Sequence, residues 1–135
     1  GSLENKLREV KDEFESTREE IKKLEGKISK LSEIAKHIIT IEEITKNSET
    51  NMSYLPQSKH MILQASIIAL KKRGIEPSSL NSHTLQKDLQ DLNEKKRQLY
   101  YHYRKVKIDW KQIRIARSNL NRLWSPSKYN ELDKQ

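Results

Sequence analysis

The chain has 135 residues, of which 33% are hydrophobic and 34% are charged, and its net charge is +8. A rounded globular domain needs more apolar residues, whereas few Gly and Pro with abundant Glu, Lys, Leu and Ile are typical of long helices. The absence of Cys excludes disulfides and thiolate metal sites, and no apolar run approaches the roughly 18 residues of a membrane span. Gly1 and Ser2 resemble a tag remnant, so we expect residues 3–135 to be a piece of a larger cytoplasmic protein.

A heptad pattern occupies the first third of the chain. From Leu3 to Ile38 the core positions are spaced alternately four and three residues apart, which predicts a coiled-coil helix. We expect this helix to span about residues 3–46, with Gly26 on its outer face. The predicted seam residues are Leu3, Leu7, Val10, Phe14, Thr17, Ile21, Leu24, Ile28, Leu31, Ala35 and Ile38.

Residues 47–82 form a predicted insert, in which a loop containing Pro56 precedes a short helix from His60 to Arg73. Gly74 suits the end of that helix. We expect the short helix to cover extra apolar residues near the end of the first helix, and so to form a local three-helix core. Its predicted inward residues are Met61, Ile62, Ala65, Ile68 and Ala69, and those beneath them are Ile34, Ile41 and Ile44.

The four-and-three spacing returns in a second long helix, predicted at about residues 83–124, with Asn81 or Ser82 as its N-cap. Pro126 ends this helix, and residues 125–135 are predicted to be a disordered tail. The seam residues are Leu85, Leu89, Leu92, Lys96, Leu99, Tyr103, Val106, Trp110, Ile113, Arg117, Leu120 and Trp124. Lys96 and Arg117 interrupt the seam, either by packing their stems and turning their charges outward, or by setting register or binding a partner.

Two helices of equal length, each about 63 Å long, can pack side by side across a compact insert only if they are antiparallel. The sequence therefore predicts a single all-α domain: a long antiparallel two-helix coiled-coil hairpin with a short third helix packed at its tip. In this register Leu3 lies near Trp124, and Ile38 lies near Leu89.

Positive charge is concentrated in the last helix. Residues 83–135 have a net charge of +7, and the segment Lys95–Arg122 contains one acidic residue, Asp109. Basic residues recurring every seven positions can follow a phosphate backbone, and a neighbouring Tyr can stack on a base. Alternatively, this face is solvated and pairs with acidic residues of the first helix, such as Glu13 and Glu19. The predicted DNA-binding residues are Arg97, Tyr100, Arg104, Lys107, Lys111 and Arg114.

An apolar row, Tyr101, Ile108 and Ile115, also recurs every seven residues and points away from the seam. The predicted pairing places it too far from the insert to be covered by it. An exposed apolar row indicates a partner surface, either for self-association or for docking on the rest of the parent protein. The alternative is scattered surface residues without a partner.

The sequence contains no recognisable catalytic or metal-binding pattern. Its four histidines, His37, His60, His83 and His102, share no ligand spacing, and no Gly-rich phosphate loop is present. We therefore expect no cofactor, no metal and no small-molecule substrate, and predict that this fragment is not an enzyme.

Four segments resemble the C-terminal helical region of conjugative relaxases, the mobilisation proteins of Gram-positive mobile elements. They are ISKLSEIAKHII at 28–39, MILQASIIALKKRG at 61–74, Leu85 through the YYHYR at 100–104, and ARSNLNRL at 116–123. Their order and spacing carry the resemblance, whereas residues 41–59 lack the Tyr- and Arg-rich stretch of the family.

Relaxases nick one DNA strand at a transfer origin, with a tyrosine and a metal held by a separate nuclease domain. The resemblance thus implies a non-catalytic accessory domain in the bacterial cytoplasm. Its implied partners are DNA of the origin-of-transfer region, bound weakly or non-specifically, and either other relaxosome proteins or a second copy, with no membrane. Two alternatives remain open: a coiled coil that binds only protein through Tyr101, Ile108 and Ile115, and an RNA-binding helical arm like that of a synthetase.

Overall fold

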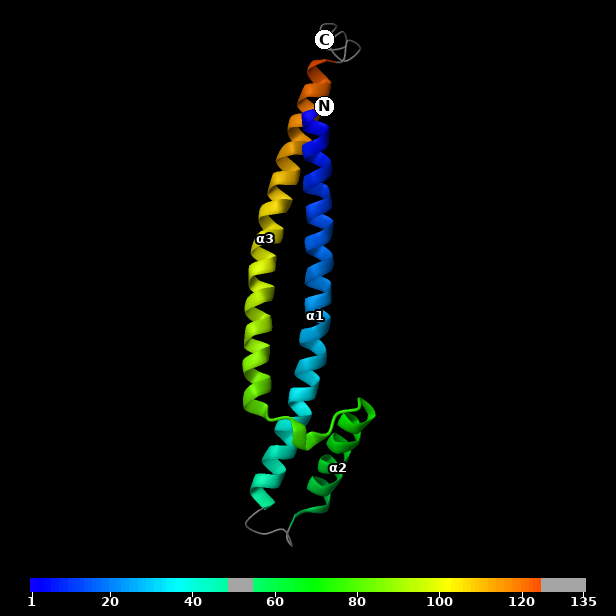
Figure 1. Cartoon of the computed structure of the whole chain (residues 1–135), viewed down its shortest axis with the longest axis vertical. Helices are drawn as coiled ribbons and strands as arrows, with labels where there is room; N and C mark the ends of the chain where they lie inside the picture. The colour runs from blue at the N-terminus through cyan, green and yellow to red at the C-terminus, as the bar shows by residue number, and fades with distance from the viewer. Residues whose placement is uncertain (49–54, 125–135) are drawn as a thin grey trace. The chain divides into compact units, whose positions relative to one another are not determined.

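A computed structural model of the chain describes residues 1–48 and 55–124, and within these ranges every regular element is helical (Figure 1). The helices are α1 (Ser2–Ser48), α2 (Gln57–Lys72), the short 3₁₀ helix η2 (Pro77–Ser79) and α3 (Ser82–Leu123). The predicted all-α fold is confirmed, and α1 packs on α3. The predicted tail at 125–135 and part of the predicted loop, 49–54, lie outside the described residues.

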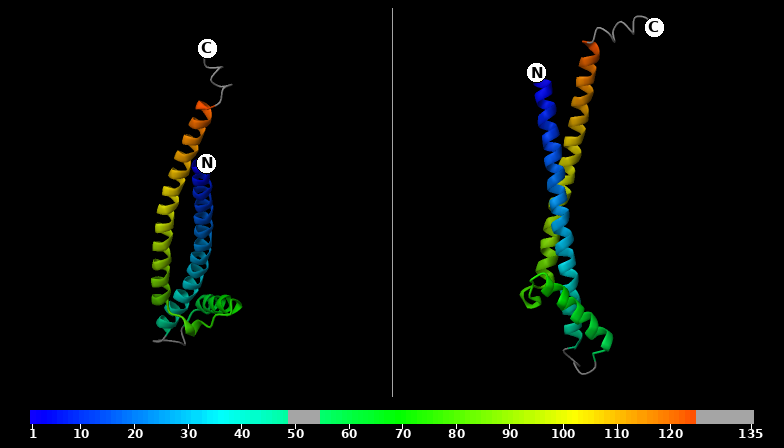
Figure 2. Two further views of the ribbon diagram at one scale, coloured as in Figure 1. Left: turned by 45° about the horizontal axis from the view of Figure 1, so that its top comes forward. Right: turned by 90° about the vertical axis from the view of Figure 1, so that its right-hand side faces the viewer.

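The chain divides into two compact units, and α1 contributes residues to both. The first unit combines Gly1–Lys23 with the chain from Lys96 onward, and the second is Leu24–Lys95. The further views in Figure 2 allow the helical segments of each unit to be followed by their colours.

In the first unit, the heptad residues of α1 pack against α3. Phe14 is 9% exposed, and its ring centroid lies 5.1 Å from that of Tyr103 and 5.0 Å from that of Trp110. Leu7, Thr17 and Ile21 are also buried.

The heptad prediction covers both long helices. All the predicted seam residues of α1, and those of α3 as far as Arg117, are buried or half-buried, so this part of the heptad prediction is confirmed.

The predicted seam is wrong in the last two turns of α3. Leu120 is exposed, and Trp124 is 82% exposed, so neither is covered by α1. The predicted pairing of Leu3 with Trp124 is also wrong, because the structure places Arg117 Nη1 3.7 Å from Glu4 Oε2. The prediction aligned the ends of two equal helices, but the packing of Phe14 between Tyr103 and Trp110 sets a different register.

The second unit has a core to which all three α-helices contribute. Ala35 and Ile38 of α1, Leu70 of α2 and Leu85 of α3 form a buried cluster. The half-buried residues packed around it are Leu31, Ile34, Ile41, Ile75, Leu80 and Leu89. The predicted three-helix core and the covering roles of Ile34 and Ile41 are thus confirmed, and Leu89 packs against the cluster that contains Ile38.

The predicted inward face of α2 is wrong. Met61 is 66% exposed, and Ile62, Ala65 and Ile68 are exposed as well. The buried face consists instead of Leu63, Ser66, Ile67 and Leu70. Both faces have helical spacing, because the segment MILQASIIAL is apolar on nearly every side. The buried choice includes a serine, whose Oγ lies 3.4 Å from His37 Nδ1.

Backbone hydrogen bonds end α2 at the predicted glycine. Gly74 has a φ of +73°, its N–H donates to the carbonyl of Lys71, and the N–H of Ile75 donates to that of Leu70. This pattern is a Schellman motif, which requires the left-handed conformation that glycine adopts without strain. Ile75 and Leu70 also pack in the same core, as the motif usually provides.

The start of α3 is fixed by two side chains. Asn81 Oδ1 accepts a hydrogen bond of 2.8 Å from the backbone N–H of Thr84, so Asn81 is the N-cap and this prediction is confirmed. Glu42 of α1 accepts hydrogen bonds from both the backbone N–H, at 2.9 Å, and the hydroxyl of Ser82. These hydrogen bonds lower the pKa of the Glu42 carboxyl below its ordinary value.

Candidate functional site

The basic side chains predicted to bind DNA lie along one side of α3, within the first unit. Arg97, Arg104, Lys107, Lys111 and Arg114 are all exposed, and we call these five residues the basic face. An α-helix turns about 100° per residue, so residues seven apart lie in one row with a spacing of about 10.5 Å along the axis. Arg97, Arg104 and Lys111 form one such row, and Lys107 and Arg114 form the row beside it.

Aromatic packing positions one end of this face. The guanidinium carbon of Arg114 lies 5.1 Å from the ring centroid of Trp110, whose ring in turn packs against Phe14. An Arg that stacks on an aromatic ring keeps its N–H donors directed outward from the ring edge and loses little entropy when it binds. Arg114 is therefore held ready for an anionic ligand.

Three residues of the basic face have no charged partner within the part of the chain that the structure describes. Among the described residues, Arg104, Lys107 and Lys111 make no salt bridge and no cation–π contact. Arg97, by contrast, takes part in a further interaction. Adjacent cations without acidic partners repel one another. An anion bound to this face relieves that repulsion, so its binding is favourable.

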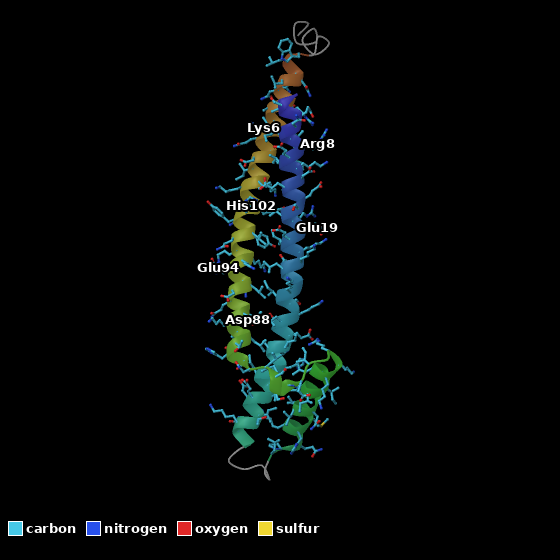
Figure 3. All side chains as sticks on the ribbon, in the orientation of Figure 1. Lys6, Arg8, Glu19, Asp88, Glu94 and His102 are labelled. Carbon is cyan, nitrogen blue, oxygen red and sulfur yellow. The ribbon has the colours of Figure 1, made fainter. Side chains whose placement is uncertain are left out.

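Two of the acidic residues of α1 that were candidates to neutralise the basic face, Glu13 and Glu19, are directed away from it. Glu13 Oε1 lies 2.9 Å from Nε2 of His102, and His102 is about 140° around α3 from Lys107, given 100° per residue. Figure 3 shows Glu19 projecting from the side of α1 away from α3. Neither carboxylate supports the alternative in which the two helices neutralise each other's charge.

A shallow depression of about 460 Å³ lies on α3 at the Arg114 end of the basic face. Lys111, Arg114, Ile115, Arg117 and Ser118 line it. Cationic N–H groups with a hydroxyl form a donor set that suits phosphate oxygens. Since Arg117 already pairs with Glu4, the donors available to a phosphate are those of Lys111, Arg114 and Ser118. The sequence pattern did not single out Ser118, because one serine on a helix carries no signal.

Tyr100, the predicted base-stacking residue, is half-buried. Its ring meets the ring of Tyr103 edge-on at a centroid distance of 6.4 Å, and Nζ of Lys96 lies 6.0 Å from its centroid. The structure therefore places Tyr100 beside the basic face but engages its ring within the fold. Lys96 is half-buried, and its ammonium group lies near the face of the Tyr100 ring.

The apolar row of Tyr101, Ile108 and Ile115 lies on the back of α3. These side chains are 59%, 55% and 52% exposed, and Nζ of Lys105 lies 5.4 Å from the ring centroid of Tyr101. Each residue of this row lies four positions after a residue of the basic row formed by Arg97, Arg104 and Lys111. Residues four apart are neighbours on a helix surface, so the two rows run side by side. The predicted exposure of this row is confirmed.

Two histidines of the described residues, His37 and His102, serve helix packing, and the described histidines and carboxylates form no candidate metal site. No group of three His, Asp or Glu side chains among them could hold a metal ion. His37 contacts Ser66 and His102 contacts Glu13, each as part of helix packing. No helix in the described ranges is both long enough and apolar enough to cross a bilayer.

Comparison of the chain with family models, curated proteins and solved structures gives no match. The surface of α3 presents the two features that point to a function: the basic face, and the apolar row beside it.

Proposed function

We propose that this chain is a non-catalytic accessory domain of a conjugative relaxase, in which the basic face of α3 binds the DNA backbone. The observation that carries the proposal is the set Arg104, Lys107 and Lys111, which is exposed on one side of a helix and has no acidic partner in residues 1–48 and 55–124. Such a set contacts phosphates whatever the base sequence, so the binding is non-specific and depends strongly on salt.

In this proposal α1 is a support that holds α3 as the second arm of an antiparallel coiled-coil hairpin. Within the first unit, Glu4 pairs with Arg117 and the later residue Glu13 pairs with the earlier residue His102, which supports opposite directions. In the second unit, Glu42 meets Ser82 at the very start of α3, which agrees with the same direction. The short helix α2 caps the tip and contributes Leu70 to the core there.

The support matters because binding energy is lost if the basic residues must first be ordered. Cations on a rigid helix are already in their rows, so mainly their side-chain rotamers lose freedom on binding. The depression lined by Lys111, Arg114 and Ser118 provides the best-defined phosphate position.

The test is a fluorescence anisotropy titration of a labelled DNA duplex, and of its single strand, against purified wild-type and variant chains. Arg104→Gln with Lys111→Gln should weaken binding at least about tenfold at about 50 mM salt, because two phosphate contacts are removed. The matched control is Lys23→Gln with Lys30→Gln, which removes the same charge from exposed positions of α1. If both double variants lose affinity equally, net charge and not the basic face is responsible. If wild type does not bind at low salt, the proposal is wrong.

A coiled-coil module that binds only protein is the second candidate, and the exposed apolar row favours it. The titration separates the two candidates, since this module has no affinity for DNA beyond that of any basic protein. A duplex or single strand of RNA in the same titration tests the RNA-arm alternative, which predicts a preference for RNA.

A further inference from the structure

The row of Tyr101, Ile108 and Ile115 is the most extended exposed apolar feature of the first unit. Its ends are two heptads apart on α3, hence about 21 Å along the helix axis, and more than half of each side chain's surface is exposed. The described residues of α1 in this unit pack on a different side of α3, through Phe14 and its neighbours. A row of this length spans about four helical turns, which is the footprint of a docked helix.

The borders of the row are basic. Positions three and four residues away are the surface neighbours of a helical residue, and for Ile108 these are Arg104, Lys105, Lys111 and Gln112. The charged neighbours of Tyr101 and Ile115, by the same spacing, are Arg97, Arg104, Lys105 and Lys111. None of these charged neighbours is acidic, and Nζ of Lys105 lies over the ring of Tyr101. The row therefore combines an apolar centre with a cationic rim.

This charge pattern selects the occupant. Two α3 helices packed through this row would bring Arg104, Lys105 and Lys111 of each copy against those of the other, which is repulsive. Among the described residues, α1 exposes no large apolar side chain, so the α1 of a second copy cannot fill the row. Helix α2 does expose Met61 and Ile68, but its sequence contains no acidic residue.

We propose that the row docks an acidic amphipathic helix of another protein. Its apolar residues would recur at heptad spacing to cover Tyr101, Ile108 and Ile115, with Glu or Asp on both flanks to meet the cationic rim. A shallow depression of about 440 Å³ borders Ile108, and its lining includes the acidic Glu13 and Asp109 as well as Lys105 and Val106. The partner side chain that enters it should therefore be apolar, while the partner's carboxylates meet the cationic rim. The contact lies on the back of α3. It shares Arg104 and Lys111 with the basic face, whereas Lys107 and Arg114 lie outside it.

The probe is a labelled synthetic peptide of about three heptads, with Leu at the two core positions and Glu at the flanking positions of each heptad. Its controls are the same peptide with Lys in place of Glu, and a helix-breaking permutation of the Glu peptide that has no apolar stripe. Anisotropy should show binding of the Glu peptide to wild type, with much weaker binding of either control.

Ile108→Ser with Ile115→Ser should weaken binding of the Glu peptide by about tenfold to a hundredfold, because two half-exposed side chains no longer become buried. The matched control is Ile62→Ser with Ile68→Ser, which changes two similarly exposed isoleucines of α2 and should leave the affinity within about twofold. Circular dichroism should show that both variants remain helical.

Three outcomes would overturn the proposal: no binding to wild type, equal binding of the permuted peptide, or equal affinity of the Glu peptide for wild type and for the variant with serine substitutions in the row. Sedimentation provides a fourth, because a wild-type dimer that the double serine substitution converts to a monomer would identify a second copy as the occupant. The double serine variant should retain DNA binding, so failure of this proposal and failure of DNA binding are distinguishable.

Discussion

Replacement of Phe14 by Leu tests the contact that holds α3 against α1 in the first unit. The Phe14 ring is 9% exposed, stacks on Tyr103 at an interplanar angle of 28° and tilts by 37° against Trp110. Leu keeps most of the apolar volume at this position but removes both ring pairs. Phe14→Leu should therefore lower the free energy of unfolding while leaving the chain helical.

The magnitude follows from the two ring pairs. Each aromatic pair contributes about 0.5–1.5 kcal/mol beyond the burial of its surface, so the loss of two should cost about 1–3 kcal/mol. Tyr101→Leu is the matched control, because it removes an exposed ring from α3 that contacts only Lys105 among the described residues. A surface change of this kind should alter stability by less than about 0.5 kcal/mol.

Urea unfolding followed by circular dichroism measures both changes. Tryptophan fluorescence gives a second measurement, since Trp110 should become more exposed in Phe14→Leu while the already exposed Trp124 contributes a constant signal. Equal stability of Phe14→Leu and Tyr101→Leu, with unchanged emission, would refute the inferred packing of α1 on α3.

Three further predictions concern the helices and their ends. Gly26→Ala should stabilise the chain by about 1 kcal/mol in urea unfolding, because a Cβ at this exposed helical position meets no atom within 4 Å. Gly74→Ala should instead destabilise it by about 1–2 kcal/mol, because φ is +73° there. Changes of the same sign at the two glycines would contradict the helix boundaries. Glu42→Gln should cost about 0.3–1 kcal/mol near neutral pH through loss of the anion at the start of α3. The pKa of Glu42 is lowered in the folded chain, so this difference should vanish as pH falls through that pKa, and a difference that persists in acid would contradict the carboxylate's role.

The long helices could be predicted from the sequence because their seam repeats over many turns. In α1 every predicted seam residue from Leu3 to Ile38 is buried or half-buried, and even the polar Thr17 is buried. Asn81 and Gly74 were predictable for a different reason, since each residue type suits a backbone geometry found at helix ends. Patterns of this kind are local, and local chemistry decides them.

The buried face of α2 and the register of the seam could not be predicted, because both depend on contacts between distant residues. Helix α2 has two faces of similar apolar content, and the choice of Leu70 over Met61 depends on the core that Ile38 and Leu85 provide. The heptad pattern allows α3 to slide by whole turns, and the contacts of Phe14 with Trp110 select one position.

The candidate site was predictable in its charge but not in the state of its aromatic residues. Arg104 and Lys111 are exposed in one row, as their seven-residue spacing predicts, and Lys107 is exposed in the row beside it. The sequence assigns the adjacent residues Tyr100 and Tyr101 to different sides of the helix, since they differ by about 100° around it, but it does not reveal which ring the fold engages. In the structure Tyr100 packs against Tyr103, whereas Tyr101 is the exposed ring.

The salt dependence of duplex DNA binding tests the central claim most directly. Four phosphate contacts, by Arg104, Lys107, Lys111 and Arg114, predict a slope of log K against log salt concentration of about −3.6. Replacement of Arg104 and Lys111 by Gln should reduce this slope to about −1.8, while the control change of Lys23 and Lys30 should leave it unaltered. A wild-type slope near zero, or an equal slope in all three proteins, would contradict DNA backbone binding by the basic face of α3.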